Sequence, residues 1–514
     1  MRVCFYTLGC KVNLNETGAL EQMFRSAGFT IVPEGEEADV FVVNSCTVTN
    51  FGDQKSRKWL RRAKRENPGA VTVLTGCYPQ AFPEEAAQFM EADLVCGNGD
   101  RKAILDNVLK LLDGHERIVA IAPHAKGEQF EELPVERFET HTRAFIKVED
   151  GCNRQCAYCV IPRARGPVRS RSEESILAEL RQLAASGYRE VVLSAISLPS
   201  YGLDTGTDLV ELVEKCAEVE GIERIRLGSL DPDMLTPESI TRLAAVDKLC
   251  PQYHLSLQSG CSATLRRMRR VNPAEQYAEV VSQLRAAYGG RPVSFTTDCI
   301  CGFPGETPED FAESCDFLKK IGFLKVHVFP YSRRSGTPAY DFPEQVHERE
   351  KQARSREMNA IAEDIRREVL AAYEGSEDDV LLETPLSGTL FTGYTRLYIP
   401  VVVSAPGHKS GNQEEEPTVS AEARCFFPFT HEERAHGGKN NGRNDGNVSV
   451  GHILCRHKGV EKDCADHPDH EKTVERGLFF PLPDGFINCH AGPGKESGRE
   501  DDKEVVPVIV FRML

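Results

Sequence analysis

Strand-like and helix-like stretches alternate along the first 113 residues. The apolar runs predict strands over Arg2–Thr7, Asp39–Asn44, Val71–Gly76 and Asp93–Cys96. The stretches between them have helical character and predict helices over Glu16–Ala27, Asp53–Glu66 and Ile104–Leu112. This alternation predicts a doubly wound α/β domain over residues 1–113, in which ligands bind beyond the carboxyl ends of the strands.

The alternation stops at residues 114–142, which are rich in Glu, His and Pro and are predicted to form a linker. It resumes over residues 143–375, where helices such as Glu173–Ser186 separate six predicted strands. These strands are Ala144–Val148, Glu190–Ala195, Arg224–Gly228, His254–Gln258, Val293–Cys299 and Lys325–Phe329. Six strands with right-handed crossovers predict a partial (βα)6 barrel, with its chemistry at the carboxyl ends of the strands.

The last part of the chain changes character twice. Residues 376–403 contain two or three strand-like runs with glycine turns, which predict the start of a small β-barrel. Residues 404–504 are rich in His, Gly, Asn, Lys and Glu without helical or strand periodicity, and we expect a disordered insertion there. Residues 505–514 are apolar again and could supply a closing strand.

Composition narrows the class of protein. The chain has 514 residues, 40% of them hydrophobic and 27% charged, which is typical of a globular protein of several domains. No apolar run approaches the length of a membrane span, and the first residues resemble a strand rather than a signal peptide. Eighteen cysteines in such a chain indicate reduced thiols and metal ligation, so we expect a cytoplasmic protein.

Three of these cysteines lie in one short loop after the first strand of the predicted barrel. Cys152, Cys156 and Cys159 have the spacing C-x-x-x-C-x-x-C. Three thiolates this close can hold one iron–sulfur cluster and leave one iron open, which makes a site reactive rather than structural. A zinc knuckle or a set of buried thiols is the alternative interpretation, although a fourth ligand is not evident nearby.

Three further cysteines each follow a strand of the first domain. Cys10, Cys46 and Cys77 come shortly after the first, second and third predicted strands. Because the carboxyl ends of parallel strands share one edge of a sheet, these cysteines can converge on a second metal site. Ordinary buried cysteines remain the alternative.

The net charge of −16 argues against a nucleic-acid partner, but the basic residues are clustered. Seven of the eleven residues from Lys55 to Arg65 are basic, including Arg61, Arg62 and Arg65. Two more groups follow, at Arg163, Arg165, Arg169 and Arg171 and at Arg266, Arg267, Arg269 and Arg270. A phosphate backbone is the favoured partner of these groups, and a merely solvated surface is the alternative.

Five short motifs, four of which contain one of these cysteines, follow one another along the chain. These are Thr7-Leu8-Gly9-Cys10-Lys11-Val12-Asn13, Asn44-Ser45-Cys46-Thr47-Val48-Thr49, Thr75-Gly76-Cys77, Asp150-Gly151-Cys152 and, without a cysteine, Gly302-Phe303-Pro304-Gly305-Glu306-Thr307. Their order resembles that of the methylthiotransferases, a family of radical S-adenosylmethionine enzymes, and the resemblance covers about residues 1–400. It is greatest to the bacterial branch acting on N6-threonylcarbamoyladenosine at position 37 of tRNA, 3′ of the anticodon, which the Lys11-Val12-Asn13 form of the first motif and residues 164–171 favour.

The resemblance implies two 4Fe-4S clusters and S-adenosyl-L-methionine as cofactors. Cys152, Cys156 and Cys159 would hold the radical cluster, and Cys10, Cys46 and Cys77 an auxiliary cluster that carries the transferred sulfur. Cofactor contacts would come from Tyr158, Ser229, Asp231, Gln258 and Ser259. The C-terminal barrel would be a TRAM domain.

The implied partners are a tRNA anticodon stem-loop and an electron donor such as flavodoxin or ferredoxin. The substrate's threonyl carboxylate needs a cation, and Arg163, Arg165 and Arg169 follow the central cysteines closely enough to supply one. Two rival functions stay open. One is a methylthiotransferase acting on a ribosomal protein. The other is a non-catalytic iron–sulfur RNA-binding protein, because Ala195 and Pro199 stand where the family usually has glycines.

Overall fold

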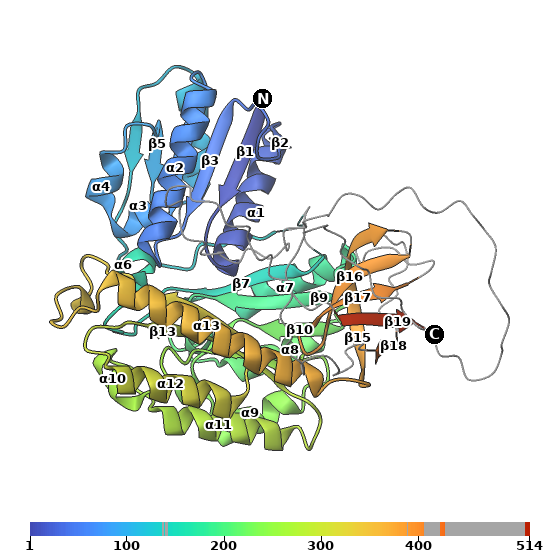
Figure 1. Ribbon diagram of the computed structural model, residues 1–514. Helices are drawn as coiled ribbons and strands as arrows, with labels where there is room; N and C mark the ends of the chain where they lie inside the picture. Colours follow the sequence, from blue (N-terminus) through green and yellow to red (C-terminus); the bar gives the residue numbers. More distant parts are fainter. Residues whose placement is uncertain (136–137, 139–141, 388, 406–421, 427–508, 514) are drawn as a thin grey trace, which may run out of the picture.

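The computed structural model describes residues 1–135, 138, 142–387, 389–405, 422–426 and 509–513. The chain forms an N-terminal α/β domain, a central core of two parallel-stranded sheets and a small C-terminal β-barrel (Figure 1). The N-terminal domain stands on the core next to α6 (Ile161–Arg165), and the C-terminal barrel lies at the core's side (Figure 1). Within the described residues, no helix combines the length and hydropathy that crossing a membrane requires.

The N-terminal domain is built on one parallel sheet in the order β2-β1-β3-β4-β5-β6. These strands are β1 (Arg2–Thr7), β2 (Thr30–Val32), β3 (Val40–Ser45), β4 (Val71–Gly76), β5 (Leu94–Cys96) and β6 (Ile118–Ala120). The sequence missed β2 and β6, which are edge strands of three residues each. Because β6 lies in the predicted linker, the sheet extends beyond residue 113.

The helices of this domain are α1 (Lys11–Ser26), α2 (Asn50–Glu66), α3 (Cys77–Ala81), α4 (Pro83–Ala87) and α5 (Lys102–Leu112). Helix α1 begins five residues before the predicted start at Glu16, because Cys10 is its N-cap and the side chain of Asn13 accepts from the Cys10 amide at 3.4 Å. Thr49 caps α2 by accepting a hydrogen bond from the amide of Gly52 at 3.2 Å. The first residues of α1, α2 and α3 thus stay close to the ends of β1, β3 and β4.

The core contains the six parallel strands of the predicted partial barrel, divided between two sheets. One sheet has the order β10-β9-β7-β8 and the other β11-β12-β13-β14, with a break at Gly228 between β10 and β11. The strands are β7 (Ala144–Asp150), β8 (Arg169–Ser170), β9 (Glu190–Ala195), β10 (Arg224–Leu227), β11 (Ser229–Leu230), β12 (Gln252–Leu255), β13 (Ser294–Cys301) and β14 (Lys325–Pro330). Strand β8 is antiparallel to β7 and was not predicted.

Helices cover the outside of these sheets (Figure 1). They are α7 (Glu173–Ala185), α8 (Leu209–Ala217), α9 (Pro237–Ala244), α10 (Ser262–Arg267), α11 (Ala274–Ala287), α12 (Pro308–Ile321) and α13 (Glu348–Ala371), with short turns at Leu198–Ser200, Pro232–Met234 and Pro338–Tyr340. Helix α12 starts as predicted: the Thr307 hydroxyl accepts from the Asp310 amide at 3.1 Å, and Pro308 occupies the first turn. Among the described residues, the largest hydrophobic cluster lies between these helices and the two sheets.

The C-terminal barrel has five strands in the closed order β15-β16-β17-β19-β18. They are β15 (Glu377–Ser387), β16 (Leu390–Thr395), β17 (Pro400–Ser404), β18 (Glu422–Phe426) and β19 (Ile509–Met513). Strand β18 corrects the expected lack of structure at residues 404–504; its pairing with β15 and β19 comes from distant segments, which local periodicity does not reveal. The remainder of that segment beyond residue 405 lies outside the described residues.

A buried charge cluster fastens the C-terminal barrel to the core. Glu190 on β9 is within 2.6 Å of Arg226, 3.3 Å of Arg224 and 3.9 Å of Arg143. Arg226 also donates to the Thr395 carbonyl of the barrel at 2.7 Å. Separating one partner from a buried ion cluster leaves an uncompensated buried charge, which is strongly destabilising. This cluster therefore fixes the barrel against the end of the core opposite the cysteine loop.

Candidate active site at the interface of two domains

The loop that carries Cys152, Cys156 and Cys159 runs from β7 to α6 and is held closed by main-chain contacts. The Cys152 amide donates to the Gly166 carbonyl at 3.0 Å, and the Cys159 amide donates to the Cys156 carbonyl at 3.1 Å. Gly151 has φ +94°, and a Cβ atom there would lie 1.9 Å from the Pro167 carbonyl oxygen. Glycine is therefore required for the loop to fold back on itself.

The middle of this loop is held by hydrogen bonds and packing contacts with the rest of the core. The Ala157 amide donates to the Met268 carbonyl at 2.9 Å, and the Ala157 carbonyl accepts from the Ala339 amide at 2.8 Å. Tyr158 packs against the small hydrophobic cluster around Met268 and Phe303. Burial raises the pKa of the Cys159 thiol to about 12, so at neutral pH the thiol keeps its proton unless a metal centre binds the thiolate.

The second set of cysteines is brought together at the carboxyl edge of the N-terminal sheet. Cys10 caps α1 after β1, Cys46 follows β3, and Cys77 opens α3 directly after β4. Burial, with a smaller effect of the nearby thiols of Cys77 and Cys10, raises the pKa of Cys46 to about 12. Cys46 and Cys77 are buried whereas Cys10 is exposed, so the group opens toward one side.

Each triad has one arginine directed at one of its sulfurs, a feature that the sequence did not reveal. The Nε atom of Arg165 donates to Sγ of Cys77 at 3.2 Å, across the boundary between the domains. The Nη1 atom of Arg270 lies 3.9 Å from Sγ of Cys156. Cationic N–H donors of this kind stabilise anionic sulfur.

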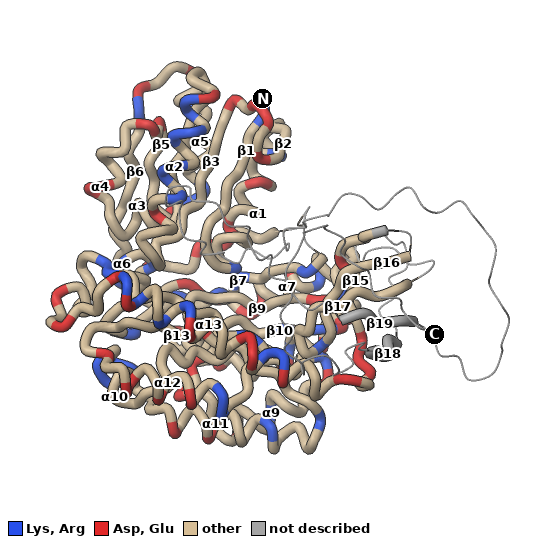
Figure 2. The backbone as a smooth tube through the Cα atoms, in the orientation of Figure 1, with Lys and Arg blue, Asp and Glu red and all other residues tan. Residues whose placement is uncertain are grey.

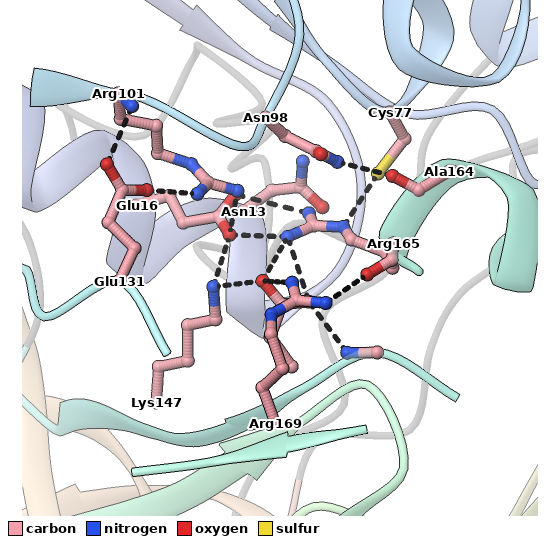
Figure 3. A network of polar contacts seen from close by, with 12 residues as sticks. Asn13, Glu16, Cys77, Asn98, Arg101, Glu131, Lys147, Ala164, Arg165 and Arg169 are labelled. Carbon is pink, nitrogen blue, oxygen red and sulfur yellow. Dashed lines mark hydrogen bonds and ion pairs between the residues drawn. The ribbon is translucent and has the colours of Figure 1, made fainter. Parts of the chain in front are cut away.

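A buried network of charges extends from Cys77 to Asp150, which lies two residues before Cys152 (Figure 3). Glu16 of α1 accepts from Arg101 at 2.6 Å, from Lys147 of β7 at 2.8 Å and from Arg165 at 2.5 Å. Burial alone would raise the pKa of Glu16, but Arg101, Arg165 and Lys147 outweigh it and lower the pKa to about 2. Asp150, two residues before Cys152, is paired with Lys147 at 2.6 Å and with Arg165 at 3.4 Å. The same side chains therefore hold both cysteine sites.

A second contact between the domains lies beside Cys46. Arg334, which follows β14, donates to the Thr47 hydroxyl and to the Asp53 carboxylate, each at 2.6 Å. The Asn50 amide donates to the Ser332 hydroxyl at 3.1 Å. The core thus holds the cysteine edge of the N-terminal sheet on two sides.

The spacing of the sulfurs does not suit a single tetrahedral metal ion. A tetrahedral zinc site with Zn–S bonds of about 2.3 Å places its sulfurs about 3.8 Å apart. Among the described residues, neither triad brings its three sulfurs within 4.8 Å of one another. With three thiols and an N–H donor directed at one sulfur, each group has the donor chemistry of a three-cysteine cluster site.

The predicted cofactor contacts are distributed around the cysteine loop. Asp231 is paired with Arg154 at 3.2 Å and with Arg270, so both of its oxygens are engaged. The Ser259 hydroxyl is buried, 3.0 Å from that of Ser314. Ser229 is exposed where β11 begins, and Gln258 has φ +69° at the edge of the same sheet. Ser229 and Gln258 are therefore better placed than Ser259 to meet a bound molecule.

The three arginines expected at the substrate cavity separate into two kinds. Arg165 and Arg169 are buried, and both approach Asp150, at 3.4 Å and 3.5 Å. Arg163 is exposed and lines a cavity of about 560 Å³ between the domains. The cavity is lined by Gln80, Pro83, Ile121, Pro123, His124, Cys152, Asn153, Pro162, Arg163, Gly166 and Pro167. Arg163 is thus the member of the three that can meet a ligand there.

The other basic groups are partly neutralised. On α2, Arg61 is paired with Glu91 at 2.9 Å, and Arg62 and Arg65 are paired with Glu66 at 3.1 and 3.6 Å. Blue segments nevertheless run along α2 and around α6 and α10 (Figure 2). In the third group, Arg267 is paired with Asp310 at 2.5 Å and Arg270 is buried, whereas Arg266 and Arg269 are exposed.

Comparison with known proteins agrees with this geometry. Residues 146–318 match the Radical SAM superfamily, and residues 2–97 match the Uncharacterized protein family UPF0004. The chain is 39% identical to the threonylcarbamoyladenosine tRNA methylthiotransferase MtaB of Bacillus subtilis, over 78% of this chain and 90% of that protein. The chain belongs to the methylthiotransferase family. It is 40% identical to the MtaB protein of Aquifex aeolicus over 73% of the chain and 92% of that protein.

A second group of relatives is named for a different substrate. The chain is 34% identical to the tRNA-2-methylthio-N(6)-dimethylallyladenosine synthase of Carboxydothermus hydrogenoformans, over 76% of the chain and 90% of that protein. Membership in the family makes this chain a radical S-adenosylmethionine enzyme and a tRNA methylthiotransferase, with S-adenosylmethionine and 4Fe-4S clusters as its cofactors. The interpretation as a non-catalytic iron–sulfur protein is therefore wrong.

Proposed function

We propose that this methylthiotransferase converts N6-threonylcarbamoyladenosine at position 37 of tRNA to its 2-methylthio derivative. The observation that carries the proposal is the cavity between the domains, which is lined by both Arg163 and Cys152. A cation at a cavity beside the radical loop suits an adenine whose N6 substituent ends in a carboxylate. The MtaB relatives, which carry threonylcarbamoyladenosine in their names, support the same substrate.

The six cysteines are proposed to hold the two clusters. Cys152, Cys156 and Cys159 would bind the cluster to which S-adenosylmethionine is attached, and Cys10, Cys46 and Cys77 the auxiliary cluster. When bound, these groups supply the radical and the sulfur that side chains cannot provide. The protein's own contribution is to bury the sulfurs, to direct Arg270 and Arg165 at them and to fix the two loops against each other.

The substrate proposal depends on what the N6 substituent needs. Threonylcarbamoyl carries a carboxylate and a hydroxyl, whereas dimethylallyl is apolar and needs no cation. A buried carboxylate without a partner is very costly, and arginine can bind one with two parallel hydrogen bonds. Arg163 lies 5.4 Å from the Phe82 ring, a cation–π distance that fixes the guanidinium while its edge stays accessible.

The tRNA would be held by exposed cations around this cavity. Arg163 and Arg333 are exposed near the contact between the domains, and Lys55 and Lys58 are exposed on α2. Phe51 is 42% exposed at the start of α2, where an unstacked base of the anticodon loop could pack on its ring. We propose this surface, together with the C-terminal barrel as a TRAM domain, as the site of the anticodon stem-loop.

Two synthetic anticodon stem-loops test the substrate directly. One carries threonylcarbamoyladenosine and the other dimethylallyladenosine, in otherwise identical sequences. The reduced, cluster-loaded enzyme is expected to form the methylthio product on the first and little on the second, while consuming S-adenosylmethionine in both assays. Product on the dimethylallyl stem-loop alone would favour the second candidate function, that of the Carboxydothermus relative.

A further inference from the structure

Arg165, six residues after Cys159 in the chain, reaches across the boundary between the domains to the sulfur of Cys77. It is the last residue of α6 and is completely buried. Its Nη1 and Nη2 atoms donate to the two oxygens of Glu16 at 2.5 and 3.1 Å, and its Nε atom donates to Sγ of Cys77 at 3.2 Å. All three nitrogens of the guanidinium thus donate hydrogen bonds to the N-terminal domain, and Nη1 also approaches Asp150.

The position of the Nε atom is set by the other contacts. A guanidinium is planar, and two parallel hydrogen bonds to one carboxylate fix its plane. Glu16 is itself held by Arg101 at 2.6 Å and by Lys147 at 2.8 Å, so the carboxylate cannot turn with the guanidinium. The N–H···S contact with Cys77 is therefore built into the network rather than being a chance approach (Figure 3).

The charge of Arg165 is already balanced by Glu16 and Asp150. Arg165 differs from Arg101 and Lys147 in one respect: its Nε–H group donates a hydrogen bond to a sulfur. Hydrogen bonds to the sulfurs of an iron–sulfur cluster stabilise its more negative, reduced form and so raise its reduction potential.

We propose that Arg165 is a positioning residue that sets the reduction potential of the auxiliary cluster through its hydrogen bond to Cys77. The inference rests on the proposed role of Cys77 as a ligand of that cluster. The radical triad has a longer contact, 3.9 Å from Arg270 to Cys156, and no contact with Arg165. The effect of Arg165 is accordingly confined to one of the two clusters.

A matched pair of substitutions separates the hydrogen bond from the ion pair. Arg165→Lys keeps a positive charge beside Glu16 but has no donor at the position of Nε. Arg101→Lys makes the same change at the same carboxylate, where no sulfur is contacted. Both proteins are loaded with clusters and titrated with a reductant while their EPR signals are recorded, without tRNA.

The auxiliary cluster is expected to become harder to reduce in Arg165→Lys and to keep the wild-type potential in Arg101→Lys. The potential of the radical cluster is expected to stay unchanged in both. An unaltered auxiliary potential in Arg165→Lys, or an equal shift in the two variants, overturns the proposal. Because no tRNA is present, the result does not depend on the substrate.

A measurement without any change at Arg165 covers the case in which that variant fails to fold. Protein with Cys152, Cys156 and Cys159 replaced by Ala and with 15N-labelled arginine retains only the auxiliary cluster. Pulsed EPR is expected to detect coupling of the reduced cluster to an arginine nitrogen, and its absence overturns the proposal. Loss of the signal in a further Cys77→Ala variant tests the ligand assignment separately.

Discussion

Arg165 of the core donates a hydrogen bond of 3.2 Å to the sulfur of Cys77 in the N-terminal domain. The two residues are 88 positions apart, and Arg165 comes only six residues after Cys159. One buried side chain thus relates the radical loop to the proposed auxiliary site. The relative position of the two cysteine groups is consequently a property of the interface between the domains, and both domains must fold for it to exist.

The two triads are predicted to have separate tasks. Replacing Cys46 with Ala removes one proposed ligand of the auxiliary site and leaves the loop at residues 152–159 intact. We expect this variant to cleave S-adenosylmethionine to 5′-deoxyadenosine under reducing, anaerobic conditions but to form no methylthio product. Chromatography of the nucleoside and mass spectrometry of the tRNA measure the two activities.

Cys156→Ala is the matched change in the other triad, and we expect it to abolish both activities. Cys250→Ala, which changes a buried cysteine outside both triads, should preserve both. If Cys46→Ala stopped cleavage of S-adenosylmethionine as completely as Cys156→Ala, the separation into two sites would be wrong.

Arg163 is predicted to bind the threonyl carboxylate. Arg163→Ala should reduce kcat/KM on the threonylcarbamoylated stem-loop by about 10- to 100-fold, as the loss of a hydrogen bond to a charged group implies. Cleavage of S-adenosylmethionine without tRNA should continue. Arg291→Ala, a change at an exposed arginine just before β13 begins, is the control and should have no effect. Equal kinetics of the two variants would remove Arg163 from the substrate site.

The basic face of α2 is predicted to bind phosphates even though Arg61, Arg62 and Arg65 have carboxylate partners. Changing these three residues to Ala should weaken tRNA binding and flatten its dependence on salt, by a slope of roughly one for each phosphate that the variant no longer neutralises. The double variant Lys102→Ala and Lys110→Ala, which removes two positive charges from exposed positions on α5, serves as the control. An affinity for tRNA equal to that of the unchanged protein would mean that α2 is only a solvated surface.

Sequence reasoning succeeded where local pattern determines structure and failed where distant segments meet. The strand–helix alternation predicted β1, β3, β4 and the six barrel strands, and the cap at Thr307 was correct because its hydrogen bonds are local. The edge strands β2 and β6 are too short to show a period. The burial of Arg165 and Arg169 was not foreseen, because Glu16 lies 149 residues before Arg165 in the chain.

The buried charge cluster around Glu190, between the core and the C-terminal barrel, should make the stability of the protein dependent on pH. Burial alone would raise the pKa of Glu190, but Arg226, Arg224 and Arg143 outweigh it and lower the pKa to about 2, from an ordinary value of 4.5. A lowered pKa stabilises the folded state above pH 4.5, and this contribution is lost as the pH falls toward 2.

Glu190→Gln should therefore reduce the free energy of unfolding by about 3 kcal/mol at pH 7, since it leaves buried guanidiniums without their anion. The difference from the wild type should shrink as the pH falls below 4.5. Urea unfolding at several pH values measures it, with the exposed Glu220→Gln as the control. A difference that stayed constant down to about pH 3 would contradict the lowered pKa of Glu190.

Mass spectrometry of tRNA nucleosides tests the central claim most directly. Total tRNA is compared between cells that contain the gene for this protein and cells that lack it, with a Cys156→Ala allele as the catalytically inactive control. We predict that 2-methylthio-N6-threonylcarbamoyladenosine disappears without the protein, that its unmethylthiolated precursor accumulates, and that the 2-methylthio derivative of dimethylallyladenosine is unchanged. Loss of the dimethylallyl derivative with the threonylcarbamoyl derivative intact would contradict the account.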